Sequence, residues 1–67
     1  MEENMREVFT ADKMYKVEMI KEMLAENNIE SFILNQKGSE LLLGEIRLFV
    51  DEKDEKKALE LIENHEM

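Results

Sequence analysis

The chain has 67 residues, which is enough for one domain with a small hydrophobic core. Its 17 acidic and nine basic residues leave a net charge of −8, and it contains no cysteine. This composition excludes disulfides and thiolate metal sites, and so acidic a surface disfavours binding to nucleic acid and to anionic membranes.

The N-terminal half of the sequence predicts a strand, a helix and a second strand. Residues 6–10 are rich in β-branched and aromatic side chains, which is typical of a short strand. Residues 13–27 form a helix in this interpretation, because apolar side chains recur every three or four positions. These apolar positions are Met14, Val17, Ile20 and Leu24. Residues 31–34, with the sequence Ser-Phe-Ile-Leu, then predict the second strand.

The C-terminal half predicts a loop, a third strand and a second helix. The loop covers residues 35–43, and the strand covers residues 45–50. In this strand Ile46, Leu48 and Val50 alternate with polar or aromatic residues, so we expect them to share one face. The second helix follows Asp51, and its apolar stripe includes Ala58, Leu61, Ile62 and His65.

The order β-α-β-β-α predicts an α+β fold of the ferredoxin-like type without its final strand. A right-handed crossover makes the first two strands parallel, and the third strand fits between them. We therefore expect a three-stranded sheet in the order 1-3-2 with two helices on one face. The first strand is then a free edge of the sheet. The whole chain, residues 1–67, is one domain in this interpretation, with frayed ends at residues 1–4 and 65–67.

Several short segments of the chain match the pattern of a known family. They are Val8-Phe9-Thr10, Glu18, Ile20, Leu24, Asn28-Ile29, Leu43-Gly44, Leu48-Phe49-Val50, Asp54 and Ala58-Leu59-Glu60-Leu61-Ile62. In these residues the chain resembles a family of prokaryotic signal-transducing proteins with a GlnB-like (PII-type) ferredoxin fold. One departure is Asn28, where the family more often has glycine, but asparagine tolerates the same backbone conformation. The resemblance covers roughly residues 5–63 and implies a small bacterial regulatory or adaptor domain. It does not imply nucleotide binding.

The sequence offers no recognisable catalytic group. A nucleophile with a nearby base, a pair of carboxylates in a pocket or a metal site would be needed. The serines are Ser31 and Ser39, and His65 lies at the end of the last helix, where a histidine interacts favourably with the helix C-terminus. We therefore expect a protein that is not an enzyme and that uses no cofactor and no metal.

The 35–43 loop contains the candidate ligand site. Lys37, Gly38 and Ser39 could offer a positive charge and backbone amides to an anion, although an ordinary turn explains them as well. Leu41 and Leu42 follow in an apolar run that reaches Leu43. Because exposed leucines are costly, these residues either fold onto the core or meet a partner, and the sequence does not choose between the two.

Two further groups of residues are candidate partner surfaces. Tyr15, Met19 and Met23 form a second stripe on the first helix, which either binds a partner or broadens the core. If Val8 points inward, alternation sends Phe9 outward, and the same argument applied to the third strand sends Phe49 outward. We expect these two aromatic residues to form a cluster on the uncovered face of the sheet.

The function expected from these features is that of a cytoplasmic protein-binding module in signal transduction. The N-terminal residues Met1-Glu2-Glu3-Asn4 lack the features of a signal peptide. We expect a homodimer that associates through the uncovered sheet face or the free edge of the first strand, and an unidentified protein partner. The alternative is a small-ligand or anion sensor that uses the 35–43 loop.

Overall fold

The computed structural model of the chain describes residues 4–35 and 45–65. Its elements are β1 (Met5–Ala11), α1 (Met14–Glu26), β2 (Ser31–Asn35), β3 (Ile46–Asp51), the single 3₁₀ turn η2 (Glu52–Asp54) and α2 (Glu55–His65). The predicted order β-α-β-β-α is confirmed. The bounds of the three strands and of α1 differ from the predicted ones by one residue at most.

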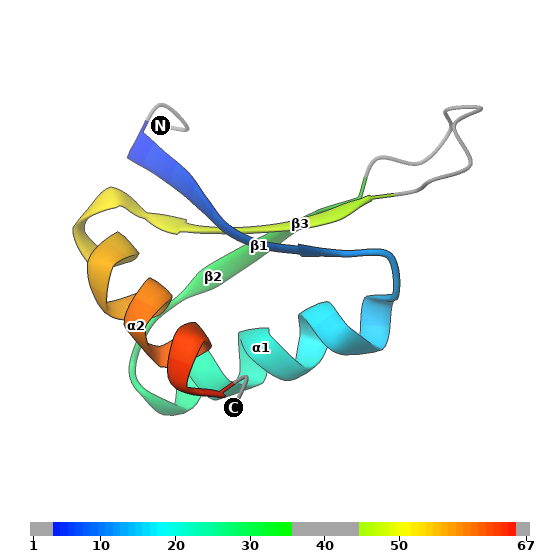
Figure 1. The fold of residues 1–67 in the computed structure, drawn as a ribbon. Helices are drawn as coiled ribbons and strands as arrows, with labels where there is room; N and C mark the ends of the chain where they lie inside the picture. Colours follow the sequence, from blue (N-terminus) through cyan, green and yellow to red (C-terminus); the bar gives the residue numbers. More distant parts are fainter. Residues whose placement is uncertain (1–3, 36–44, 66–67) are drawn as a thin grey trace.

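The described part of the chain forms one three-stranded sheet in the order β1-β3-β2. The central strand β3 is antiparallel to both of its neighbours. Both helices lie against the same face of the sheet (Figure 1). The predicted α+β, ferredoxin-like arrangement is therefore confirmed.

No helix in the described ranges is long and apolar enough to cross a membrane.

The hydrophobic core lies between the sheet and the two helices. Buried residues alternate along β3, where Ile46, Leu48 and Val50 point toward the helices as predicted. The other buried apolar residues are Val8, Val17, Ile20, Leu24, Ile29, Ala58 and Ile62. α1 contributes three of these buried residues and α2 contributes two. Both helices lie on the same side of the sheet, so they leave its other face uncovered (Figure 1).

The turn between α1 and β2 depends on a left-handed residue at the helix end. Asn28 has a φ of 63°, and its backbone N–H donates to the carbonyl of Ala25 at 3.0 Å. The N–H of Ile29 donates to the carbonyl of Leu24 at 2.9 Å. These two bonds are the pair that closes a helix in a Schellman motif. Asparagine at position 28 thus holds the conformation expected of it and brings buried Ile29 directly ahead of β2.

A β-bulge in β1 changes the direction of one predicted surface residue. Glu7 lies opposite Phe49, but Phe9 lies opposite Leu48, so Val8 is an extra residue in the ladder. The two residues at such a bulge face a single residue on the neighbouring strand. Val8 is buried as expected, and Phe9 also packs against the core beside it. The prediction that Phe9 points to the uncovered face is therefore wrong.

Candidate functional site

The candidate site is the face of the sheet that lies opposite α1 and α2. We call it the open face, because neither helix of the described residues covers it (Figure 1). The alternation of side chains and the pairing register assign residues to it. They are Met5, Glu7 and Thr10 on β1, Arg47, Phe49 and Asp51 on β3, and Phe32 and Leu34 on β2.

An apolar patch occupies the part of the open face that β2 and β3 share. Phe32 lies directly opposite Phe49 in the antiparallel ladder, and Leu34 lies opposite Arg47. Residues that are directly opposite in such a ladder have their Cβ atoms about 4.5–5.5 Å apart, so the two aromatic rings are neighbours. The side chains of Phe32 and Leu34 are 47% and 46% exposed. The patch therefore offers apolar area that a second molecule could cover.

Charged side chains border this patch on the β1 side. Glu7 lies opposite Phe49, and its carboxylate is 3.6 Å from the guanidinium of Arg47. The same guanidinium is 3.6 Å from the carboxylate of Glu45. All three side chains are about half exposed, and ion pairs of this kind contribute little to stability. These ion pairs place charges of both signs beside Phe49 on the open face.

An open hollow of about 370 Å³ lies at the end of the sheet where β1 and β2 begin and β3 ends. It is lined by Asn4, Met5, Asn28, Glu30, Phe32, Asp51, Lys53 and Asp54. Three carboxylates face one ammonium in this lining, so the hollow is negative. Within residues 4–35 and 45–65, no group of three or more acidic or histidine side chains is placed to hold a metal ion. Phe32 belongs both to the hollow and to the apolar patch.

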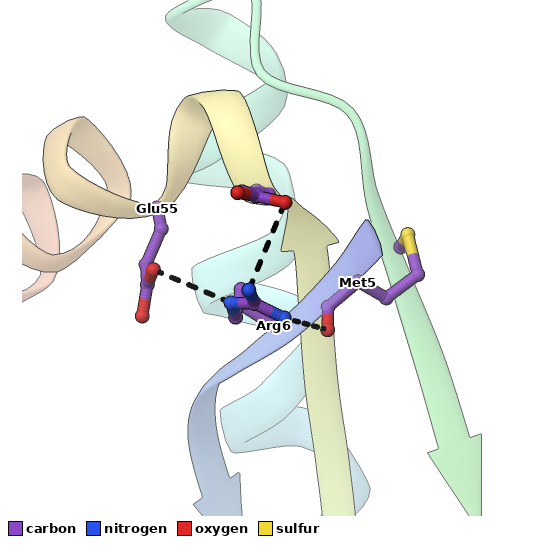
Figure 2. A network of polar contacts seen from close by, with 4 residues as sticks. Met5, Arg6 and Glu55 are labelled. Carbon is purple, nitrogen blue, oxygen red and sulfur yellow. Dashed lines mark hydrogen bonds and ion pairs between the residues drawn. The ribbon is translucent and has the colours of Figure 1, made fainter. Parts of the chain in front are cut away.

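A second cluster of charged side chains connects the start of β1 with η2 and with the first residue of α2 (Figure 2). The guanidinium of Arg6 is 3.7 Å from the carboxylate of Glu52 and 3.8 Å from that of Glu55. Its Nη1 also donates a long hydrogen bond of 3.5 Å to the carbonyl of Met5. Arg6 lies opposite Val50, a core residue, so this cluster belongs to the helix-covered side of the sheet. We interpret it as a structural contact between β1 and α2.

The predicted site residues lie on different parts of the molecule. Phe49 lies on the open face as expected, whereas Phe9 packs against the core. Tyr15 and Met19 are 62% and 48% exposed on α1, but Met23 packs against the core. The predicted stripe on α1 is thus divided between a surface pair and a core residue. Lys37, Gly38, Ser39, Leu41 and Leu42 lie outside the described residues.

Phe32 and Leu34 belong to the apolar patch, and the sequence did not single them out as site residues. Both belong to the run Ser-Phe-Ile-Leu, in which no polar residue separates the apolar ones. A signal was nevertheless present in the alternation of a strand. Once Ile33 points to the core, its two neighbours must point to the opposite face.

One of three comparisons with known proteins gave a match. A family model described as "putative prokaryotic signal transducing protein" matches residues 5–66. Because the match covers almost the whole chain, the chain belongs to this family. A search of curated proteins gave no match, and a search of solved structures gave none either.

Proposed function

We propose that this domain is a non-catalytic protein-binding module in signal transduction, and that its partner binds the open face. Membership in a signal-transducing family supports the general role. The observation that carries the proposed site is an apolar patch on the sheet face that both helices leave uncovered. In this patch Phe32 and Leu34 are exposed and Phe49 is half buried. In this role the domain needs neither a cofactor nor a metal.

The composition of the open face is typical of a recognition surface. Contiguous exposed apolar patches on small soluble proteins often mark interaction sites. Aromatic side chains near the centre of an interface frequently supply much of the binding energy, and a polar rim around them supplies specificity. Phe32 and Phe49 correspond to such a centre. Glu7 and Arg47 correspond to the rim, because they lie next to the aromatic pair in the ladder.

The net charge supports a protein as the partner. A charge of −8 repels nucleic acid and anionic membranes, so we propose a protein partner. A cytoplasmic location is a separate part of the proposal. A homodimer is part of the same proposal, because a chain of 67 residues has a small core and gains stability from a second subunit.

The charges in the hollow favour protein binding over the alternative of an anion sensor. The hollow presents the carboxylates of Glu30, Asp51 and Asp54 and one ammonium, from Lys53. An anion would be repelled there. The loop proposed for anion binding, residues 35–43, lies almost wholly outside the described residues.

A capture experiment with matched variants tests the proposed partner site. The parent, Phe49→Thr and Tyr15→Thr are each immobilised and exposed to lysate of the native organism. Tyr15→Thr is the control, because it removes an exposed aromatic side chain from α1 rather than from the sheet. We expect the parent and Tyr15→Thr to retain the same proteins and Phe49→Thr to lose them.

Circular dichroism and thermal unfolding must show that each variant is folded, because Phe49 is half buried. Equal retention by a folded Phe49→Thr and the parent would contradict the proposed site. Loss of the same proteins from Tyr15→Thr alone would move the partner surface to α1.

A further inference from the structure

The two outer strands of the sheet differ in how they are protected against pairing with another strand. β1 contains a bulge between Glu7 and Phe9, and it carries the charges of Arg6 and Glu7. β2 has a regular register with β3 from Ser31 to Asn35. Its sequence Ser-Phe-Ile-Leu-Asn holds no charge and no proline. Bulges, charges and prolines are the features by which proteins prevent edge-to-edge association, so β1 is protected and β2 is not.

The lack of charge on β2 is notable in this chain. Charged residues make up 39% of the sequence, yet five consecutive residues on an edge strand have none. In the described part of the chain, no strand pairs with the outer edge of β2. The free backbone groups of this edge can therefore receive another strand.

We propose that a second copy of this chain pairs with β2 through its own β2, in an antiparallel arrangement with two-fold symmetry. The two sheets then join into one continuous sheet. This inference rests on the homodimer of the proposed function and names the surface that forms it. That surface shares Phe32 and Leu34 with the partner site, but it does not include Phe49 on β3.

Electrostatic repulsion favours this edge over the other surfaces. Two chains with a charge of −8 each repel one another, and the repulsion is strongest where like charges are brought close together. A dimer that stacked two open faces would bring together the carboxylates of Glu7 and Asp51 from both copies. A dimer through β1 would have to accommodate the bulge and the ion pairs of Arg6. The β2 strands themselves bring together only uncharged side chains, with Glu30 directly before the strand.

The side chains of β2 are also complementary to a second copy of themselves. If the two-fold axis passes beside Ile33, residues at equal distances on either side of this position face each other. Phe32 of one copy then lies opposite Leu34 of the second copy. Both side chains point to the open face and are about half exposed, so each can cover the other. An aromatic–aliphatic pair across two strands is a favourable combination.

This dimer would have a consequence for partner binding. The open faces of the two copies would lie on the same side of the joined sheet, because residues directly opposite each other in an antiparallel ladder point to the same side. The row that contains Phe49 and Phe32 would then be extended by Leu34 of the second copy. A partner would meet one enlarged apolar surface in place of two small patches.

The test uses the parent and two variants with matched exposure and charge. Leu34→Lys places a charge on the β2 edge, and Met19→Lys places the same charge on α1 at a side chain of similar exposure. Each protein is studied by sedimentation equilibrium and by amide NMR spectra, diluted from about 1 mM to about 10 μM to span the range of weak association. We expect a parent dimer whose dilution shifts concentrate on the amides of β2, a dimeric Met19→Lys and a monomeric, folded Leu34→Lys.

Three results would overturn the inference. They are a parent that is monomeric at every concentration, dilution shifts that are confined to β1 or to the centre of the open face, and a Leu34→Lys variant that remains dimeric. The open-face variant Phe49→Thr separates this proposal from the partner site. We expect it to remain dimeric while it loses captured proteins, so each proposal can fail without the other.

Discussion

Phe32 on the edge strand β2 lies directly opposite Phe49 on the central strand β3, and this pair connects the two surfaces that we assign to binding. Phe49 lies in the middle of the open face, next to Glu7 on β1. Phe32 lies at the free edge, where it also lines the hollow. A molecule that covers Phe32 therefore changes the surroundings of Phe49, and a dimer through β2 can influence how the open face binds its partner.

The aromatic pair makes a stability prediction. Phe32→Ala and Phe49→Ala should be less destabilising together than the sum of the two single changes, because each single change already removes the contact between the rings. We expect a coupling free energy of about 0.2–1 kcal/mol, the usual value for a cross-strand pair. Urea unfolding of the parent, the single variants and the double variant measures it. Strictly additive effects would show that the rings do not interact.

The difference between core and surface predicts unequal effects for two leucines. Leu48 on β3 is fully buried, whereas Leu59 on α2 is half exposed. Leu48→Ala should lower the free energy of unfolding by about 2–5 kcal/mol, because it removes buried contacts and leaves a cavity. A domain of this size has a total stability of only about 3–10 kcal/mol, so the variant should lose a substantial part of it.

Leu59→Ala is the matched control for this core prediction. It should change the free energy of unfolding by about 0.5 kcal/mol or less, as surface substitutions usually do. Thermal unfolding followed by circular dichroism compares the two variants. A large loss of stability in Leu59→Ala would place part of the hydrophobic core on the outer side of α2.

The sequence predicts the faces of some strands and fails for others, and the reason differs from strand to strand. In β3 every second residue is apolar and buried, so the alternation of Ile46, Leu48 and Val50 alone determines which face meets the helices. In β1 the same alternation misplaces Phe9, because the bulge adds one residue to the ladder. No glycine marks this bulge, and only the pairing with β3 reveals it.

For β2 the sequence is ambiguous in another way. Phe32, Ile33 and Leu34 are all apolar, so composition does not distinguish an inner from an outer face. The register with β3 decides it, since Ile33 lies opposite buried Leu48 and its neighbours therefore point outward. The apolar patch of the candidate site became visible only once strands distant in the sequence were placed side by side.

The buried hydroxyl of Ser31 is the basis for predicting a substitution that does not reduce stability. Ser31 is buried on the core side of β2, and its Oγ forms no hydrogen bond with any residue in the described ranges. A buried hydroxyl without a partner opposes folding. Ser31→Ala should therefore leave the free energy of unfolding unchanged or raise it by up to about 1 kcal/mol. Urea unfolding is the measurement, and a loss of more than 1 kcal/mol would reveal a hydrogen-bond partner for this group.

The ion pairs of Arg6 should make a small contribution to stability, and this contribution should decrease as the salt concentration is raised. Its ion pairs are long, and its side chains are between about a third and a half exposed. Pairs of this kind contribute about 0–1 kcal/mol, and counterions screen them. Arg6→Gln should lower stability by no more than this amount in low salt and by less in high salt. Lys16→Gln, which removes one positive charge from α1, controls for the change in net charge. A salt-independent loss larger than that of the control would indicate packing by the Arg6 side chain.

The last prediction concerns the effect of salt on self-association. If two chains of charge −8 meet through the uncharged edges of β2, their long-range repulsion opposes the dimer and no ion pair across the contact favours it. Salt shortens the range of this repulsion, with a Debye length of about 30 Å at 0.01 M and about 8 Å at 0.15 M. The dimer should therefore tighten when sodium chloride is raised across this range. Sedimentation equilibrium at several salt concentrations measures the dissociation constant. Met19→Lys adds one positive charge, which makes the net charge less negative, and leaves β2 unchanged, so it should show a weaker dependence than the parent. A dimer that loosens with salt would be held by ion pairs, and the contact would then have to include charged residues outside β2.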